Sequence, residues 1–456
     1  MEIENLATRP VGRLLWEYSL PAVVGMLVMA LYNVVDRIFI GQVVGPEAIA
    51  GLALTFPIMN ITTAIGVLVG VGSSTRISIA MGRNERSEAA RLLGNAATLT
   101  FVNGAAYIAV FAIFMEPILR AFGAGDITMP YAAGYMYWVL PGLLLTNVAF
   151  GLNNVLRATG YPRRAMMTMV IGAVTNVVLD AIFVLWLDMG MVGAALATDI
   201  AMAVSAWFVV AHFFKKDVVL HFERGTFSLK SSLVLSIVTI GAAPCIVNVA
   251  SCLVNALINR SLVDHGGDMA IGAAGIFVTF TSLLVTVVLG ICMGLQPIIG
   301  YNYGAGRMER LKKAYWLAVG VSTLICTLGW AVGLAFPSLV ARIFTYDDFL
   351  IDSTVVCLRH AMWAFFVVGF QIISTTFFQS VGAPGRAMVL SLARQVIFLI
   401  PLMIWLSGRW GVEGVWLSFP ISDICATVVT FLLIIPAFRK IEKSVKYDLE
   451  GAISVE

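Results

Sequence analysis

The stretch YNVVDRIFIG, Tyr32 to Gly41, closes an apolar run that begins near Leu14. An acid and a base, Asp36 and Arg37, stand side by side in this otherwise apolar segment. An ionisable residue inside a membrane-spanning helix is costly and is functional by default. In a soluble core helix the same aspartate would only cap a helix end. The interpretation of Asp36 therefore depends on whether the run crosses a bilayer.

The composition of the whole chain favours a membrane protein. Apolar residues make up 60% of the 456 positions and charged residues only 12%, whereas a soluble domain carries about 25% charged residues. A helix that crosses a bilayer needs about 20 mostly apolar residues. The chain has twelve such runs, approximately Leu14–Ile40, Ala48–Val71, Leu92–Met115, Tyr131–Leu152, Ala165–Leu187, Val192–Phe214, Leu233–Ile258, Ala270–Leu295, Ala314–Phe336, Val355–Phe378, Met388–Leu406 and Val412–Phe438.

The distribution of positive charge gives an orientation. Of the 29 Lys and Arg residues, 22 lie at the two termini and in the even-numbered connections between the runs. Cytoplasmic segments of membrane proteins are enriched in these residues, so we expect both termini in the cytoplasm. An even number of spans agrees with this, because it places both termini on the same side. The polar segment 1–13 has no apolar signal-peptide core, and we interpret it as a retained cytoplasmic segment. Long polar connections are expected at 215–232 and at Phe336–Thr354.

The two halves of the sequence repeat each other. Pro21 matches Pro244, and GRNER at Gly82–Arg86 matches GRMER at Gly306–Arg310, with offsets of 223 and 224 residues. Parallel repeats of six spans are typical of transporters whose substrate path lies between two lobes. We therefore predict an all-α membrane protein with twelve transmembrane helices in two pseudosymmetric six-helix lobes. The expected parts are an N-terminal lobe (1–214), a cytoplasmic linker (215–232), a C-terminal lobe (233–438) and a cytoplasmic tail (439–456).

The halves differ in their acids. Asp36 is matched by Asn259, and Asp180 in the segment TNVVLD has no polar counterpart in the second half. Asn176 and Asp180 share one helix face because they are four residues apart, and a rise of about 1.5 Å per residue places Thr198 at a similar depth. These groups offer the oxygens that a small hard cation such as sodium prefers. Alternatively, two adjacent buried carboxylates disfavour double ionisation, so that one of them carries a proton.

Signatures of other function classes are absent from the sequence. The phosphate-binding pattern GxxxxGK[ST] does not occur, the four histidines are scattered and the six cysteines form no CxxC pair. We expect a protein that is not an enzyme and that has no cofactor, no metal beyond a coupling ion and no nucleic-acid partner. Five polar residues within the apolar runs stay open between a functional and a structural role: Asp199, Asp423, Arg359, His360 and Arg394.

Several motifs agree in order and spacing with one known family. Pro21 followed by YNVVDRIFIG, the NxxxD of Asn176–Asp180, QPIIGYNYGAGR at Gln296–Arg307 and the duplication resemble the multidrug and toxic compound extrusion (MATE) family over essentially the whole chain. QPIIGYNYGA and RQVIFLIPL, the latter at Arg394–Leu402, are most similar to the bacterial branch that contains the DinF and MepA-type exporters.

The resemblance implies a secondary active exporter in the bacterial inner membrane. Such a monomer exchanges amphipathic, often cationic, drugs for protons or sodium by rocker-switch alternating access, and thereby confers antibiotic resistance. Pro21 matches the family's proposed hinge. The implied ion-coupling residues are Asp36, Asn176, Asp180 and Thr198. The implied substrate-binding residues are Tyr32, Tyr135, Asn153, Met26, Met59, Met169 and Met202.

Two alternatives remain open. The seventh and tenth spans lack the acids of the family's NorM-like branch, which moves the expected coupling to the first lobe and toward protons, with sodium as the alternative ion. The alternative function is a lipid or lipid-linked oligosaccharide flippase of the same superfamily. Its cavity would need cations such as Arg359 and Arg394 to hold pyrophosphate. A channel or a receptor would leave the duplication and the one-sided acids unexplained.

Overall fold

The computed structural model describes the backbone of residues 5–43 and 46–453 and the side chains of 5–36, 51–267, 269–440 and 442. Within these ranges the protein is built from helices, with no strand. The helices are α1 (Asn5–Thr8), α2 (Val11–Val43), α3 (Pro46–Gly82), α4 (Arg86–Ala121), α5 (Met129–Ala158), α6 (Pro162–Asp180), η1 (Ala181–Trp186), α7 (Gly190–Phe213), α8 (Ser231–Gly304), α9 (Met308–Ala335), α10 (Pro337–Arg342), α11 (Asp348–Ala361), η2 (Phe365–Val367), α12 (Val368–Ser380), α13 (Pro384–Leu392), η3 (Ala393–Leu399) and α14 (Ile400–Ile453).

The described helices supply twelve crossings of a bilayer. Ten of them are long and apolar enough to cross, and a bent pair adds an eleventh. The longest candidate, Pro384–Lys440, has 57 residues, far more than the ~20 that one crossing needs. The backbone breaks within it at Gly411, where φ is 56°, so this helix supplies two crossings. Gly267, with φ 62°, breaks α8 in the same way, and its two parts, Ser231–Gly267 and Met269–Gly304, are already counted among the ten. Glycine adopts this conformation without the steric cost of a Cβ atom.

The second half differs from the sequence prediction in two places. The expected polar connection Phe336–Thr354 is largely helical, because α10 and the first turns of α11 occupy much of it. The carboxylate of Asp347 accepts a hydrogen bond from the backbone N–H of Leu350 at 3.0 Å, which is a helix N-cap. The expected span Val355–Phe378 is bent, because α11 and the segment Phe365–Ser380 meet at an angle of 56°.

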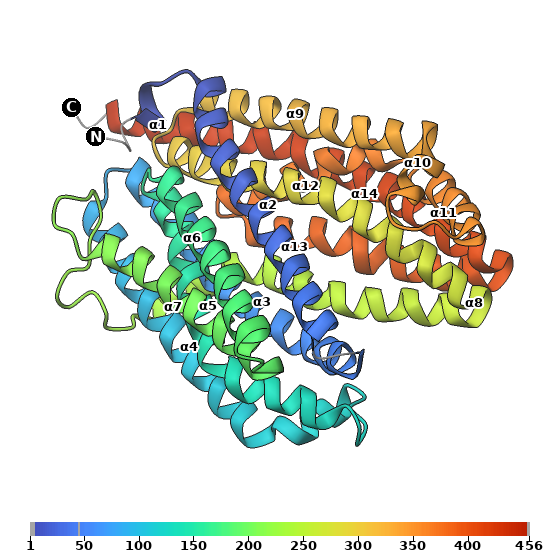
Figure 1. The fold of residues 1–456 in the computed structure, drawn as a ribbon. Coiled ribbons are helices and arrows are strands. Elements are labelled where there is room, and N and C mark those ends of the chain that lie inside the picture. The colour runs from blue at the N-terminus through green and yellow to red at the C-terminus, as the bar shows by residue number, and fades with distance from the viewer. Residues whose placement is uncertain (1–4, 44–45, 454–456) are drawn as a thin grey trace.

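The two halves of the chain meet at one end and diverge toward the other (Figure 1). The end where they meet carries the termini, and α2 and α3 both pack against α8. One apolar core runs through both halves and includes Leu14, Leu295 and Phe377. A separate core, which includes Phe111 and Tyr135, consists only of residues from the first half. The first half therefore has an end of its own that shares no core with the second half.

Glycines let the two halves approach closely where they meet. Two pairs on α8 have the spacing of small residues that brings membrane helices together. Gly290 and Gly294 lie against Val23 and Ser19 of α2, and Gly300 and Gly304 lie against Ser78 and Ile79 of α3. A Cβ atom on Gly304 would stand only 2.2 Å from the carbonyl oxygen of Ile79.

The connection 215–232 is fastened to α4. The side-chain amide of Asn95 donates to the carbonyl oxygens of Thr226 and Ser228, both at 3.1 Å. Its carbonyl oxygen accepts from the backbone N–H of Lys230 at 2.9 Å. The chain thus passes from one half to the other along the end where the halves meet.

Candidate functional site

Two acids face each other at the ends of α2 and α6 that lie farthest from the termini. Asp180 is the last residue of α6 and is fully buried. Its carboxyl group lies next to that of Asp36 on α2. The helix continues from Asp180 into the π-helical segment η1, and π-helical turns occur frequently at functional sites. The fold therefore brings together the two acids that distinguish the first half from the second.

Two tyrosines stand beside this pair of acids. Tyr32, one helical turn before Asp36, lies close enough to Asp36 and Asp180 to interact with both electrostatically. Tyr135 comes from α5, is only 3% exposed and lies in the electrostatic range of the same two acids. Phenol rings next to carboxylates make a site that is aromatic and negatively charged, which suits an organic cation.

Asn176 and Thr198 extend the group of oxygen atoms. The side-chain amide of Asn176 donates to the hydroxyl of Thr198 at 3.3 Å, which joins α6 to α7. The carbonyl oxygen of Asn176 and both carboxylate oxygens of Asp180 are buried and accept from no donor among the described residues. Buried acceptors of this kind are expensive unless a proton or a cation satisfies them. The four predicted ion-coupling residues thus lie on three neighbouring helices.

Asp199 is an acid of this region that the sequence analysis did not select. It lies on α7, where its Oδ1 atom is buried without a described donor. Its carboxylate fits against Gly142 of α5, since a Cβ atom built there would be 1.8 Å from Oδ1. Tyr135 lies within its electrostatic range. The signal was its place beside Thr198, but successive helix residues point about 100° apart, which hid its electrostatic interaction with Tyr135.

The predicted substrate-binding residues fall in four places. Asn153, Met169 and Met202 line a cavity of about 20 Å³, together with Met29, which the sequence analysis did not select. Tyr32 lines an apolar groove of about 240 Å³ between α2 and α6. Tyr135 belongs to the core of the first half, and Met59 packs against that core. Met26 is half-buried on α2.

Asn153 also holds the fold together. Its side-chain amide donates to the carbonyl oxygen of Ala165 at 2.7 Å and so joins α5 to α6. This bond occupies one of the two N–H donors of the amide, which gives Asn153 a structural contact that the sequence did not predict.

The predicted hinge Pro21 lies inside α2, which continues as a helix through it. A proline within a helix removes one backbone hydrogen bond. Its neighbours Ser19 and Val23 are the residues that touch Gly294 and Gly290 of α8. Pro21 therefore stands at the place where α2 rests on the other half, with Asp36 on the free end of the same helix.

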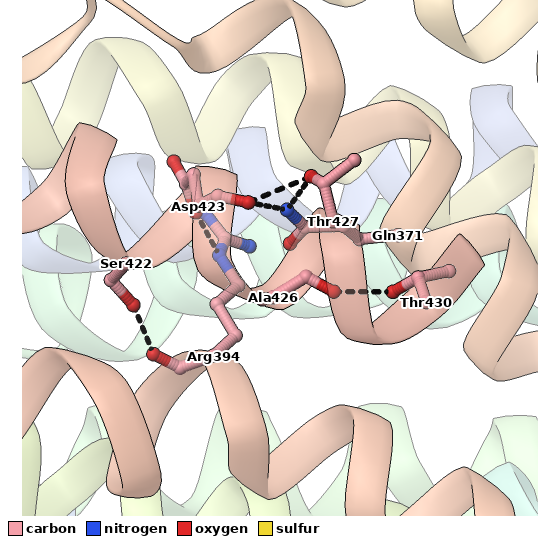
Figure 2. A network of polar contacts seen from close by, with 7 residues as sticks. All are labelled: Gln371, Arg394, Ser422, Asp423, Ala426, Thr427 and Thr430. Carbon is pink, nitrogen blue, oxygen red and sulfur yellow. Dashed lines mark hydrogen bonds and ion pairs between the residues drawn. The ribbon is translucent and has the colours of Figure 1, made fainter. Parts of the chain in front are cut away.

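The second half has an ion pair whose acid is buried and whose base is partly buried. The Nε atom of Arg394, on η3, donates to Oδ1 of Asp423, on α14, at 2.7 Å (Figure 2). The amide of Gln371 on α12 donates to the backbone carbonyl of Asp423 and, at 2.7 Å, to the hydroxyl of Thr427. The hydroxyl of Ser422 donates to the carbonyl of Arg394 at 2.6 Å. Three helices of the second half are thus tied together around one neutralised acid.

We expect Asp423→Asn to destabilise the protein strongly. Removing one partner of a fully buried ion pair costs about 3–5 kcal/mol, and we expect somewhat less here because 29% of the Arg394 side chain is exposed. Thermal unfolding of the purified protein measures this loss. The double variant Asp423→Asn/Arg394→Gln is expected to recover part of it. A single variant as stable as the wild type would contradict a structural role for the pair.

Arg359 and His360, the other two basic residues within the apolar runs of the second half, are not tied in this way to any acid that the structure describes. Arg359 on α11 is exposed, and the Nδ1 atom of His360 lies 2.8 Å from the carbonyl oxygen of Val356 one turn earlier. Of the three, only Arg394 is held by an acid among the described residues. Among those residues, no three or more His, Cys, Asp or Glu side chains form a group that could hold a metal ion.

Comparisons with known proteins agree with this architecture. The MatE family profile matches the chain twice, at residues 21–182 and 244–405. An FAD transporter of Shewanella oneidensis is 29% identical over 442 residues, covering 94% of this chain and 95% of its own. The multidrug export protein MepA of Staphylococcus aureus is 25% identical over 428 residues, covering 93% and 94% of the two chains.

A solved transporter structure has the same fold as this chain. The MATE multidrug transporter DinF-BH, solved as a complex, has a TM-score of 0.89 and 34% identity, covering 97% of this chain and 99% of its own. The two profile matches begin 223 residues apart, which is the offset of the sequence repeat. The protein is a multi-pass membrane protein with small-molecule transporters among its relatives. The chain belongs to the MatE family of transporters.

Proposed function

We propose that this protein is a secondary active antiporter that exports amphipathic, often cationic, drugs and is driven by inward flow of protons, with sodium as the alternative ion. The observation that carries the proposal is the buried pair Asp36 and Asp180 beside Tyr32 and Tyr135. Two adjacent buried carboxylates bind a proton or a cation readily and release it when their surroundings change. The same negative charge attracts an organic cation, so ion and drug compete for one region.

The arrangement of the halves supports alternating access. They diverge away from the termini (Figure 1). The acid pair belongs to the first half and lies toward the end at which the two halves are apart. By the distribution of Lys and Arg, the termini lie in the cytoplasm and the open side faces outward. The opposite conformation requires the halves to part at the glycine contacts. We further infer a bacterial inner-membrane location and a monomer.

The polar contacts between α3 and α8 are weak ones. Besides the glycine packing, Gln296 of α8 donates to the hydroxyls of Ser74 and Thr75 at 3.0 and 2.8 Å. Neutral hydrogen bonds contribute about 0.5–1.5 kcal/mol each, and no ion pair joins α3 to α8 among the described residues. Such an interface can separate and reform during a transport cycle.

Transport in cells tests the proposal. Bacterial cells without their own drug exporters would express the chain, and accumulation of a fluorescent cationic dye such as rhodamine 6G would be followed with and without a protonophore. We expect lower accumulation than with an empty vector, and loss of the difference when the ion gradient collapses. Equal accumulation, with the protein present in the membrane, would refute drug export.

Asp180→Asn is expected to impair coupling more than drug binding. The variant keeps the shape of the site but removes one of two facing carboxylates, so the remaining acid no longer shares a proton or a cation with a partner. Dye affinity, measured by fluorescence polarisation of the purified protein, should change little. The dependence of dye transport on pH or sodium should weaken. An unchanged ion dependence would remove Asp180 from the coupling site.

A second candidate function is export of a flavin nucleotide, because the first relative described above is an FAD transporter. One observation favours it. Arg157 on α5 is 3% exposed between the halves and lacks an acidic partner within 4.0 Å among the described residues. A guanidinium without an acidic partner suits a phosphate. The flippase alternative has less support, since Asp423 neutralises Arg394.

A further inference from the structure

A cavity of about 570 Å³ opens at the end of the first half that carries the N-terminus. It lies where α1, α2 and the start of α6 come together, so it is separate from the acid site at the far ends of α2 and α6. Four arginines line it: Arg9, Arg13, Arg163 and Arg164. Its volume lies in the range of small-molecule binding sites, about 300–1,000 Å³. We refer to it as the arginine pocket.

The arginine pocket carries an excess of positive charge. Glu17 is the acid that lines it, and this one carboxylate is shared by two arginines. Its Oε2 atom is 2.8 Å from Nη1 of Arg9, and its Oε1 atom is 2.8 Å from Nε of Arg13. Neither Arg163 nor Arg164 has an acidic partner within 4.0 Å in the described part of the chain. Two guanidinium groups are therefore left to attract an anion.

Contacts with uncharged rings hold Arg164 in the pocket. Its Nη1 atom donates to Nδ1 of His212 at 2.6 Å, and its guanidinium lies 5.6 Å from the centre of the Tyr161 ring. These contacts orient the group without neutralising it. An oriented guanidinium presents its N–H groups as a fork that matches the oxygens of a phosphate.

The position of the pocket indicates the source of the phosphate. The apolar spans begin at Val11 and Pro162, directly beside the four arginines. The start of a span lies at the level of the lipid headgroups, and arginine side chains at span ends reach toward them. Basic pockets between membrane helices on the cytoplasmic side bind the headgroups of anionic lipids.

We propose that the arginine pocket binds the phosphate of an anionic phospholipid and thereby joins α2 to α6. Arg9 and Arg13 flank the start of α2, and Arg163 and Arg164 belong to the first turn of α6. A phosphate held by both pairs bridges the two helices whose other ends carry Asp36 and Asp180. The lipid steadies the geometry of the acid pair from the opposite end of the same helices. This inference does not depend on which solute is transported.

Lipid binding to the purified full-length protein tests the proposal. Delipidated protein would be titrated with phosphatidylglycerol or phosphatidylcholine, with the unfolding temperature and the number of retained lipids by native mass spectrometry as readouts. We expect phosphatidylglycerol to raise the unfolding temperature by several degrees and to be retained as one tight copy, and high salt to abolish both effects. Equal effects of the two lipids on the wild type would overturn the proposal, whatever the variants do.

Two matched double variants locate the site. Arg13→Gln/Arg163→Gln removes two exposed pocket arginines, whereas Arg83→Gln/Arg86→Gln removes two exposed arginines on the same side of the membrane that do not line the pocket. We expect only the first to lose the preference for phosphatidylglycerol, and Arg13→Lys/Arg163→Lys to recover it in part. Equal lipid binding by the two glutamine variants would overturn the assignment to this pocket.

Inorganic pyrophosphate separates a lipid from a free phosphate. If the pocket takes a lipid headgroup, pyrophosphate should stabilise the protein far less than phosphatidylglycerol at the same concentration. Stabilisation by pyrophosphate with no effect of phosphatidylglycerol would overturn the lipid assignment. Dye transport in proteoliposomes with and without phosphatidylglycerol is a separate readout, so a failure of the proposed drug export would leave the binding result intact.

Discussion

Asp36→Asn is expected to abolish dye export while the protein stays folded in the membrane. Asparagine keeps the size of the side chain but cannot carry the negative charge that faces Asp180. Without that charge the pair can no longer exchange a proton or a cation between its two conformations. Dye accumulation in expressing cells should rise to the level of the empty vector. Membrane content, checked by immunoblot, should equal that of the wild type.

A matched control is Glu116→Gln. Glu116 lies on α4 and pairs with Arg120 at 3.0 Å, with 64% of its side chain exposed. An exposed pair of this kind contributes about 0–1 kcal/mol, so its loss should leave export unchanged. Asp36→Glu keeps the charge and should retain part of the activity. Normal export by Asp36→Asn would remove Asp36 from the coupling mechanism.

Gly241→Ala is expected to hold the halves apart where they now meet. Gly241 of α8 faces the backbone of α3 so closely that a Cβ atom would stand 1.8 Å from the carbonyl oxygen of Leu68. Overpacking costs typically about 1–3 kcal/mol, and every 1.4 kcal/mol or so shifts a two-state equilibrium about tenfold. The conformation described here should therefore lose about ten- to hundredfold in population relative to one in which this contact is open.

Distances between spin labels on α3 and α8 measure this shift. Dye export should fall together with the closed population, because a transporter that cannot close on one side cannot complete its cycle. Gly320→Ala on α9 is the matched control, since a Cβ atom there meets nothing within 4 Å. Equal distance distributions in the two variants would contradict a moving interface at Gly241.

Much of the fold could be predicted because its signals are local or repeated. The apolar runs predict helices one at a time, and the 223-residue repeat relates the two halves without any knowledge of contacts. Asp36 and Asp180 could be selected because Asn259 and an apolar segment replace them in the second half. The spacing of Asn176 and Asp180 placed them on one face, and the hydrogen bond to Thr198 is consistent with that placement.

Other features depend on packing that a single sequence does not reveal. The pairing of Arg394 with Asp423 joins residues 29 positions apart on different helices, and their sequence neighbours give no hint of it. The close approach of Asp199 to Gly142 depends on the crossing of α5 and α7. The start of α11 could have been recognised, because Asp347 precedes an amphipathic segment in the manner of an N-cap residue.

The most direct test of the account is transport by the purified protein in proteoliposomes under one imposed gradient at a time. A proton gradient or a sodium gradient would be applied to vesicles that contain the wild type or Asp36→Asn, and movement of rhodamine 6G would be followed by fluorescence. We expect the proton gradient to drive the dye against its own gradient through the wild type and not through Asp36→Asn. Dye transport by the variant equal to that of the wild type would contradict ion-coupled export through this pair of acids. A wild type that transports no dye under either gradient would contradict it as well.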